Sequence, residues 1–117
     1  MQHKRKNRTL GRDRDERRAL MRGLSVSLIE HGRIVTTLAK AKELRPLIEK
    51  MITTAKKDSV ATRRTIASRL GTTQNEAVAK LFKDLAPKYL ERPGGYTRII
   101  KMGRTTAGRE EAVIELV

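Results

Sequence analysis

The chain has 117 residues and carries 27 Lys and Arg against 13 Asp and Glu, which gives a formal net charge of +14. It contains no cysteine, and this excludes disulfides, thiolate metal sites and a thiol nucleophile. A chain of this length supports one hydrophobic core, and its charge favours a polyanionic partner: nucleic acid, an anionic membrane or an acidic protein.

The charge is unevenly distributed along the chain. Residues 1–12 are basic, contain no acid, and have Leu10 as their only large apolar side chain besides the initiator Met. Such a segment buries too little surface to order itself. We therefore expect a basic N-terminal arm over 1–12, ordered by an anionic partner, and a single globular domain over 13–117. The alternative for the arm is a disordered solubilising tail.

The first helix is predicted to start at Asp13, because Asp13 and Glu16 have capping-box spacing. Gly32 predicts its end. Its half-buried stripe consists of apolar residues at helical spacing: Leu20, Met21, Leu24 and Leu28.

A short strand and a long helix follow. RIVTTL, residues 33–38, is rich in β-branched residues and predicts a strand. The apolar stripe of residues 44–55 predicts a helix. Pro46 conflicts with this prediction, because a proline in a helix interior destabilises the helix by about 3 kcal/mol or more. We expect this helix to start near Ala39 and to bend near residues 42–46.

Two more helices are predicted before the C-terminal third. Ser59 is a candidate cap for a helix that ends at Gly71, and Thr73 with Glu76 forms a second capping box. The second of these helices is expected to close at Pro87.

The chain ends in two alternating segments, YTRIIKM at 96–102 and AVIELV at 112–117, with the loop GRTTAG between them. This pattern predicts a β-hairpin. The predicted fold is a two-layer α+β domain of order α-β-α-α-α-β-β, with the helices on one face of a small three-stranded sheet. The pattern does not fix where the first strand pairs.

The sequence shows no arrangement of residues that would support catalysis. His3 and His31 lack metal-site spacing, and no Gly-rich phosphate loop is present. Glu110 and Glu111 are adjacent and would point apart, which suits neither acid/base work nor a metal pair. We predict a protein that is not an enzyme and that has no cofactor, no metal site and no small-molecule substrate.

Several basic segments are instead suited to phosphate. Arg63 and Arg64 lie near a helix start, where cations are unfavourable and an external anion would compensate them. Gly94 and Gly95 beside Arg92 let backbone amides approach a phosphate, or simply form a turn. Tyr96 and Arg98 alternate onto one strand face, so that the ring could stack on a base while the guanidinium binds phosphate. Tyr96 could equally be part of the core.

The scarcity of aromatic residues, 3% of the chain, argues against a single-strand reader, which needs several stacking rings. Shape and phosphate recognition of folded RNA remains the best interpretation. A DNA-binding architectural protein is the main alternative. A membrane-surface protein is a weaker one, because the apolar stripes are committed to a core, and no apolar run approaches the roughly 18 residues of a membrane span.

The chain also resembles a known family, the bL17 family of bacterial large-subunit ribosomal proteins. The resemblance rests on strings that occur in order over nearly the whole length: RIVTTLAKAKELR at 33–45, ITTAKK at 52–57, KLF at 80–82, APKY at 86–89, RPGGYTRI at 92–99 and IELV at 114–117. It departs from the family pattern at Glu16, Gly23 and Arg109.

The resemblance implies a cytoplasmic structural component of the large subunit that binds 23S ribosomal RNA beside neighbouring ribosomal proteins, as a monomer and without membrane insertion. Together, the basic segments and the resemblance give the following candidate RNA-binding residues: Lys4, Arg5, Lys6, Arg8, Arg12, Arg17, Arg18, Arg22, Arg33, Lys40, Lys42, Arg63, Arg64, Arg92, Gly94, Gly95, Tyr96, Arg98 and Arg104.

Overall fold

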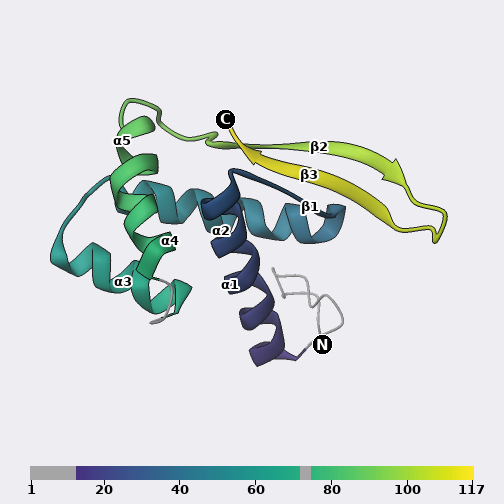
Figure 1. Cartoon of the computed structure of the whole chain (residues 1–117), viewed down its shortest axis with the longest axis horizontal. Helices are drawn as coiled ribbons and strands as arrows, with labels where there is room; N and C mark the ends of the chain where they lie inside the picture. The colour runs from purple at the N-terminus through teal and green to yellow at the C-terminus, as the bar shows by residue number, and fades with distance from the viewer. Residues whose placement is uncertain (1–12, 72–74) are drawn as a thin grey trace, which may run out of the picture.

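Helices pack against one face of a three-stranded antiparallel sheet in the computed structural model, which describes residues 13–71 and 75–117 (Figure 1). In chain order the elements are α1 (Arg14–His31), β1 (Arg33–Thr37), α2 (Leu38–Ala55), α3 (Val60–Leu70), α4 (Asn75–Lys80), the π-helical turn η1 (Leu81–Leu85), α5 (Ala86–Lys88), β2 (Thr97–Arg104) and β3 (Glu110–Leu116). The predicted α+β class and element order are confirmed, with α4, η1 and α5 continuing one another as the fourth helix.

The helix ends follow from local side-chain chemistry. The Asp13 carboxylate accepts a hydrogen bond from the Glu16 amide at 2.8 Å and caps α1. At the other end Gly32 has φ 79°, and its amide donates to the Leu28 carbonyl at 2.8 Å. Both predicted boundaries of α1 are therefore confirmed.

A reciprocal capping box starts α3. The Ser59 hydroxyl accepts from the Thr62 amide at 3.1 Å, and the Thr62 hydroxyl accepts from the Ser59 amide at 2.9 Å. The predicted cap at Ser59 and the predicted stop at Gly71 are both confirmed. The second predicted capping box begins at Thr73, which lies outside the described residues.

The two helical prolines are accommodated differently. Pro46 lies inside α2, which runs without interruption from Leu38 to Ala55 and is capped by Thr37. Pro87 lies inside the last turn, α5, so the helix closes slightly later than predicted. The Ala86 amide donates to the Leu81 carbonyl five residues back, and we attribute this widened turn to Pro87, whose ring would clash with a carbonyl in a regular helix.

The sheet has the order β1-β3-β2, with both pairings antiparallel. The first strand thus pairs with the last one, a contact that the sequence pattern left open. In the register, Ile34 and Ile99 both lie opposite Ile114 on β3. The ladder between β2 and β3 is irregular between Lys101 and Gly103, which leaves Met102 as the extra residue of a bulge.

The two faces of the sheet differ in what covers them. Ala112 and Ile114 of β3 are buried in the main core, under the helices. Val113 points to the opposite face, where the register places it between Val35 and Ile100. Because Val35 is 58% exposed, this outer face is open to solvent at its edge strands.

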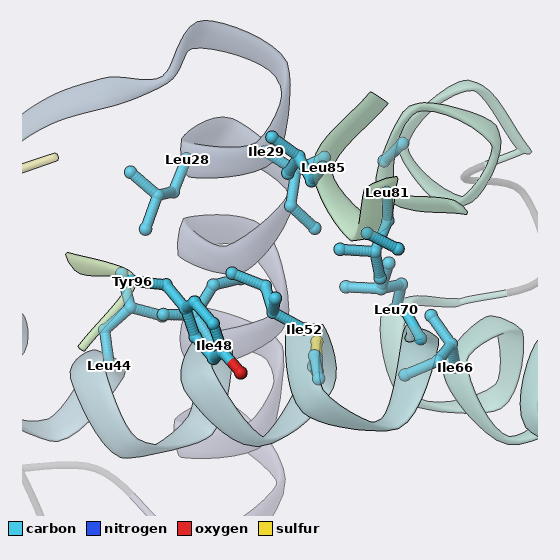
Figure 2. Close-up of a cluster of buried hydrophobic side chains, with 14 of the residues drawn as sticks. Leu28, Ile29, Leu44, Ile48, Ile52, Ile66, Leu70, Leu81, Leu85 and Tyr96 are labelled. Carbon is cyan, nitrogen blue, oxygen red and sulfur yellow. The ribbon is translucent and has the colours of Figure 1, made fainter. Parts of the chain in front are cut away.

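The core joins one side of each long helix to the sheet (Figure 2). On α1 its centre lies at Leu28 and Ile29, while Leu20 and Leu24 of the predicted stripe are only partly buried. Ser25 is fully buried and donates to the Met21 carbonyl at 2.8 Å. A hydroxyl satisfied within its own helix is tolerated in the core, which hydrophobic periodicity alone does not reveal.

Candidate nucleic-acid interface

A groove of about 680 Å³ lies between α1, α2 and α3. We call it the arginine groove. Its described lining holds six basic side chains and one acid, with four apolar residues and a serine between them. The members are Arg14, Arg17, Arg18, Arg22, Lys50 and Arg69, then Glu43, then Met21, Pro46, Leu47 and Met51, and Ser68.

Helical spacing brings the basic residues of α1 together. Arg14, Arg18 and Arg22 are four residues apart, and Arg17 lies three residues after Arg14, so they occupy one side of the helix. Met21 lies beside them and is buried at the edge of the core. The same helix therefore supplies both the cationic wall and part of the apolar floor.

The other two helices complete the groove. On α2, Glu43 and Leu47 are four residues apart, as are Pro46 and Lys50, so two adjacent rows face α1. From the end of α3, Arg69 contributes its carbonyl as well as its side chain, because Arg22 Nε donates to that carbonyl at 3.2 Å. A cation at a helix C-terminus is favourable, and this bond fixes Arg22 at the groove.

Of the predicted residues, Arg17, Arg18 and Arg22 therefore converge on one site. Sequence reasoning missed Arg14, Lys50 and Arg69. Arg14 shares the helical spacing of the others and could have been found from it. Lys50 and Arg69 join the site only through the packing of α2 and α3 against α1, which no local pattern shows.

Two other predicted cations, Arg33 and Arg98, lie on the outer face of the sheet. Both flank Glu115 of β3 in the register. Arg98 Nε donates to the Glu115 carboxylate at 2.5 Å, and Arg33 Nε lies 3.9 Å from it. A carboxylate of the protein itself thus holds Arg98, while any contact of these two arginines with RNA remains a prediction.

Tyr96 is a core residue, so the prediction that its ring stacks on a base is wrong. The side chain is 1% exposed and lies in the cluster with Leu44 and Ile48 (Figure 2). Tyr96 does not share a strand face with Arg98, because it precedes β2, which begins at Thr97. The Thr97 side chain points inward, and its hydroxyl donates to the Glu49 carboxylate at 2.7 Å. A buried ring cannot reach a base without leaving the core.

The hydroxyl of Tyr96 is held by α2. Lys56 Nζ donates to it at 2.9 Å, and Thr53 Oγ1 lies 3.2 Å away. Burial by itself raises the pKa of this hydroxyl, but its hydrogen bonds with Lys56 and Thr53, together with the charge of Lys56, outweigh burial and leave the pKa below its ordinary value. No local sequence pattern indicates this role for Lys56, because the contact joins residues 40 positions apart.

Lys56 also positions the glycine turn. Its ammonium donates to the Arg92 carbonyl at 2.6 Å, next to Gly94 and Gly95, whose φ angles are 151° and 63°. Residues with a side chain rarely adopt these φ angles. Nothing lies within 4 Å of a Cβ placed at either glycine. The turn is therefore open to solvent, and its predicted approach to a phosphate remains a prediction.

The paired arginines at the start of α3 have different surroundings. Arg63 donates to both carboxylate oxygens of Asp58, at 2.6 and 2.8 Å, and its guanidinium lies 5.3 Å from the centre of the Phe82 ring. Asp58 therefore already compensates Arg63, contrary to the expected need for an external anion, and contact of Arg63 and Arg64 with RNA remains a prediction. Arg64 is exposed.

The remaining candidates lie elsewhere. Lys42 lines a smaller hollow at the start of α2, together with Arg109 and Glu110. Arg104 Nε lies 3.6 Å from that Glu110, and Lys40 is half-buried in the first turn of α2. The five predicted residues of the arm, namely Lys4, Arg5, Lys6, Arg8 and Arg12, lie outside the described residues.

Over the described part of the chain, His, Asp and Glu nowhere gather into a group that could hold a metal ion. None of the described helices combines the length and apolar composition that a bilayer crossing requires. What the geometry offers is a concave surface with a large local excess of positive charge, which is suited to phosphates.

Comparison with known proteins identifies the family. The family model described as ribosomal protein L17 matches residues 20–117. This chain belongs to the ribosomal protein L17 family. Its members are structural proteins without enzymatic activity. The match of the family model confirms the resemblance seen in the sequence.

Individual L17 relatives match over nearly the full length. Large ribosomal subunit protein bL17 of Dictyoglomus thermophilum is 48% identical over 118 residues, covering 100% of both chains. The bL17 protein of Persephonella marina is 46% identical, covering 100% of this chain and 95% of the relative. That of Clostridium acetobutylicum is 51% identical, covering 94% and 96%.

Proposed function

We propose that this chain is a structural component of the large ribosomal subunit, where it binds and stabilises folded 23S rRNA. The observation that carries the proposal is the convergence of six basic side chains from three helices on the arginine groove, against one acid in its described lining. Membership of the L17 family supplies the context.

The mechanism is electrostatic. Cations held at fixed positions neutralise phosphates where RNA segments approach one another, and the release of condensed counterions drives binding. A rigid groove is better suited to this than a flexible surface, because the helices have already ordered the backbone that carries the arginines. The protein acts as a monomer beside neighbouring large-subunit proteins, in the cytoplasm, and no catalytic turnover is involved.

Sedimentation tests the assignment to the ribosome. The tagged chain, expressed in its native host, is run on a sucrose gradient at low magnesium, which separates the subunits. We expect it to travel with the large subunit and to resist a moderate salt wash. Its presence at the top of the gradient, or with the chromosome, would overturn the proposal and make duplex DNA the partner to test.

A double variant tests the groove itself. Arg17→Gln/Arg18→Gln removes two groove cations, whereas Lys57→Gln/Lys83→Gln removes two exposed cations that do not line the groove. Each lost phosphate contact lowers the salt dependence of binding by about one in log–log slope. In filter binding to 23S rRNA we expect the groove variant to lower the slope by about two and the control to lower it less; equal changes would contradict the groove's role.

A further inference from the structure

The lining of the arginine groove is of two kinds, and phosphate binding accounts for only one of them. The basic side chains form the rim. The apolar part of the lining forms the floor: Met21 is 8% exposed and Met51 is 1% exposed, whereas Leu47 is half-buried and Pro46 is exposed. A phosphate on the rim would leave the solvent-accessible part of this apolar floor, namely Pro46 and Leu47, in contact with water.

We propose that the arginine groove receives one unstacked nucleotide of the RNA, with its base on the apolar floor and its flanking phosphates on the arginine rim. This inference rests on the proposed function and names the feature of the RNA that the site takes. It does not require the protein to read the identity of the base.

The size and shape of the groove support a nucleotide over a duplex. Its volume of about 680 Å³ lies in the range of sites that enclose small ligands, roughly 300–1,000 Å³. An A-form helix presents its phosphates as ridges and keeps its bases stacked inside, so no part of it would enter a concave floor. Bulges and loops of folded RNA, by contrast, offer bases that can be splayed out.

The chemistry of the lining also fits a base. The described lining contains no aromatic ring, so a base would be held by other groups. A methionine thioether makes favourable contacts with aromatic rings. A planar guanidinium can stack on a base while a neighbouring arginine forms paired hydrogen bonds with a phosphate. One wall of the groove offers both the stacking contact and the phosphate contact, because it holds Arg14, Arg17 and Arg18 within about one and a half turns of α1.

Methionine methyl groups provide a direct readout. We would label the methionine methyls of the full chain with ¹³C and titrate two RNA hairpins of identical stem, one fully paired and one with a single bulged adenosine. Met21 reports on the floor. Met102, which is 57% exposed on β2 and outside the groove, is the internal control.

The ring current of a base in the groove shifts a methyl beneath it upfield. We expect the bulged hairpin to shift the Met21 signal and the paired hairpin to leave it near its free position, with Met102 unchanged by both. If both hairpins bind and shift Met21 equally, or if both bind and neither shifts it, the nucleotide proposal is wrong while RNA binding stands. If neither hairpin binds at low salt, the proposed function fails as well.

A pair of matched variants gives an independent measurement. Leu47→Gln makes the floor polar, whereas Leu90→Gln changes an exposed leucine in the turn after α5. We expect Leu47→Gln to reduce the preference for the bulged over the paired hairpin severalfold, and Leu90→Gln to preserve it. A preference unaffected by Leu47→Gln, in a variant whose melting shows that it is folded, would overturn the proposal.

Discussion

The arginines of this chain show that the partner of a charged residue is decided by its immediate geometry. Arg63 and Arg98 each donate to a carboxylate of the protein, Asp58 and Glu115. Arg17 and Arg18 instead line a groove with four other basic residues. Because an exposed ion pair contributes little to stability, the pairing of Arg63 acts mainly on local order, at the turn that leads into α3.

The pair of Asp58 and Arg63 gives a pH prediction. Hydrogen bonding by Arg63, together with its charge, lowers the pKa of the Asp58 carboxyl below its ordinary value of 3.8, with burial opposing. The pKa of Asp58 is lower in the folded chain than in the unfolded chain. The ionised carboxylate therefore contributes stability that is fully present above the unfolded pKa and is lost as the pH falls through the folded pKa.

We therefore expect Asp58→Asn to be less stable than the wild type at pH 7, with a difference that shrinks below about pH 4. Urea unfolding at pH 7 and at pH 3 measures both quantities. Asp84→Asn, which changes an exposed carboxylate on η1, is the control. A difference that stays constant between the two pH values would show that the carboxylate charge is irrelevant to stability.

Individual elements were predictable where the cause is local. Capping residues located α1 and α3, and alternation located the hairpin, because both signals lie within a few residues of the feature they specify. The pairing of β1 with β3 and the convergence on the arginine groove depend on packing between distant segments. The role of Tyr96 was ambiguous for the same reason, since burial of its ring depends on α2.

The cap of α3 gives a prediction at the scale of one element. Ser59→Ala removes the acceptor for the Thr62 amide and breaks the reciprocal capping box. Loss of such a cap costs about 1 kcal/mol, measurable as a lower midpoint in urea with an unchanged slope. Thr65→Ala is the control, because its exposed hydroxyl bonds only within the helix, to the Ala61 carbonyl; an equal loss in both variants would exclude a capping effect.

Across the whole molecule, charge and apolar surface are arranged in distinct regions. The arginine groove occupies the side formed by α1, α2 and α3. On the outer face of the sheet, Glu115 lies between Arg33 and Arg98, and the next row is apolar, from Val35 through Val113 to Ile100. Within the described residues, the arginine groove therefore concentrates basic side chains on the helical side of the domain, and we expect long-range attraction to RNA to orient the groove toward it.

The basic arm tests how far binding extends beyond the groove. Deleting residues 1–12 removes five basic side chains and no acid, which lowers the net charge from +14 to +9. If each of these residues contacts a phosphate, the salt slope for 23S rRNA falls by about four, on a scale of roughly 0.7–0.9 per contact. We expect the deletion to produce a large part of that change in slope and to lower the affinity at 100 mM salt. A melting experiment checks that residues 13–117 remain folded.

Combining the deletion with Arg17→Gln/Arg18→Gln separates the contributions of the arm and the groove, because independent contacts give additive losses of slope. An unaltered slope after the deletion would show that the arm is a solubilising tail and that the folded domain carries all of the binding.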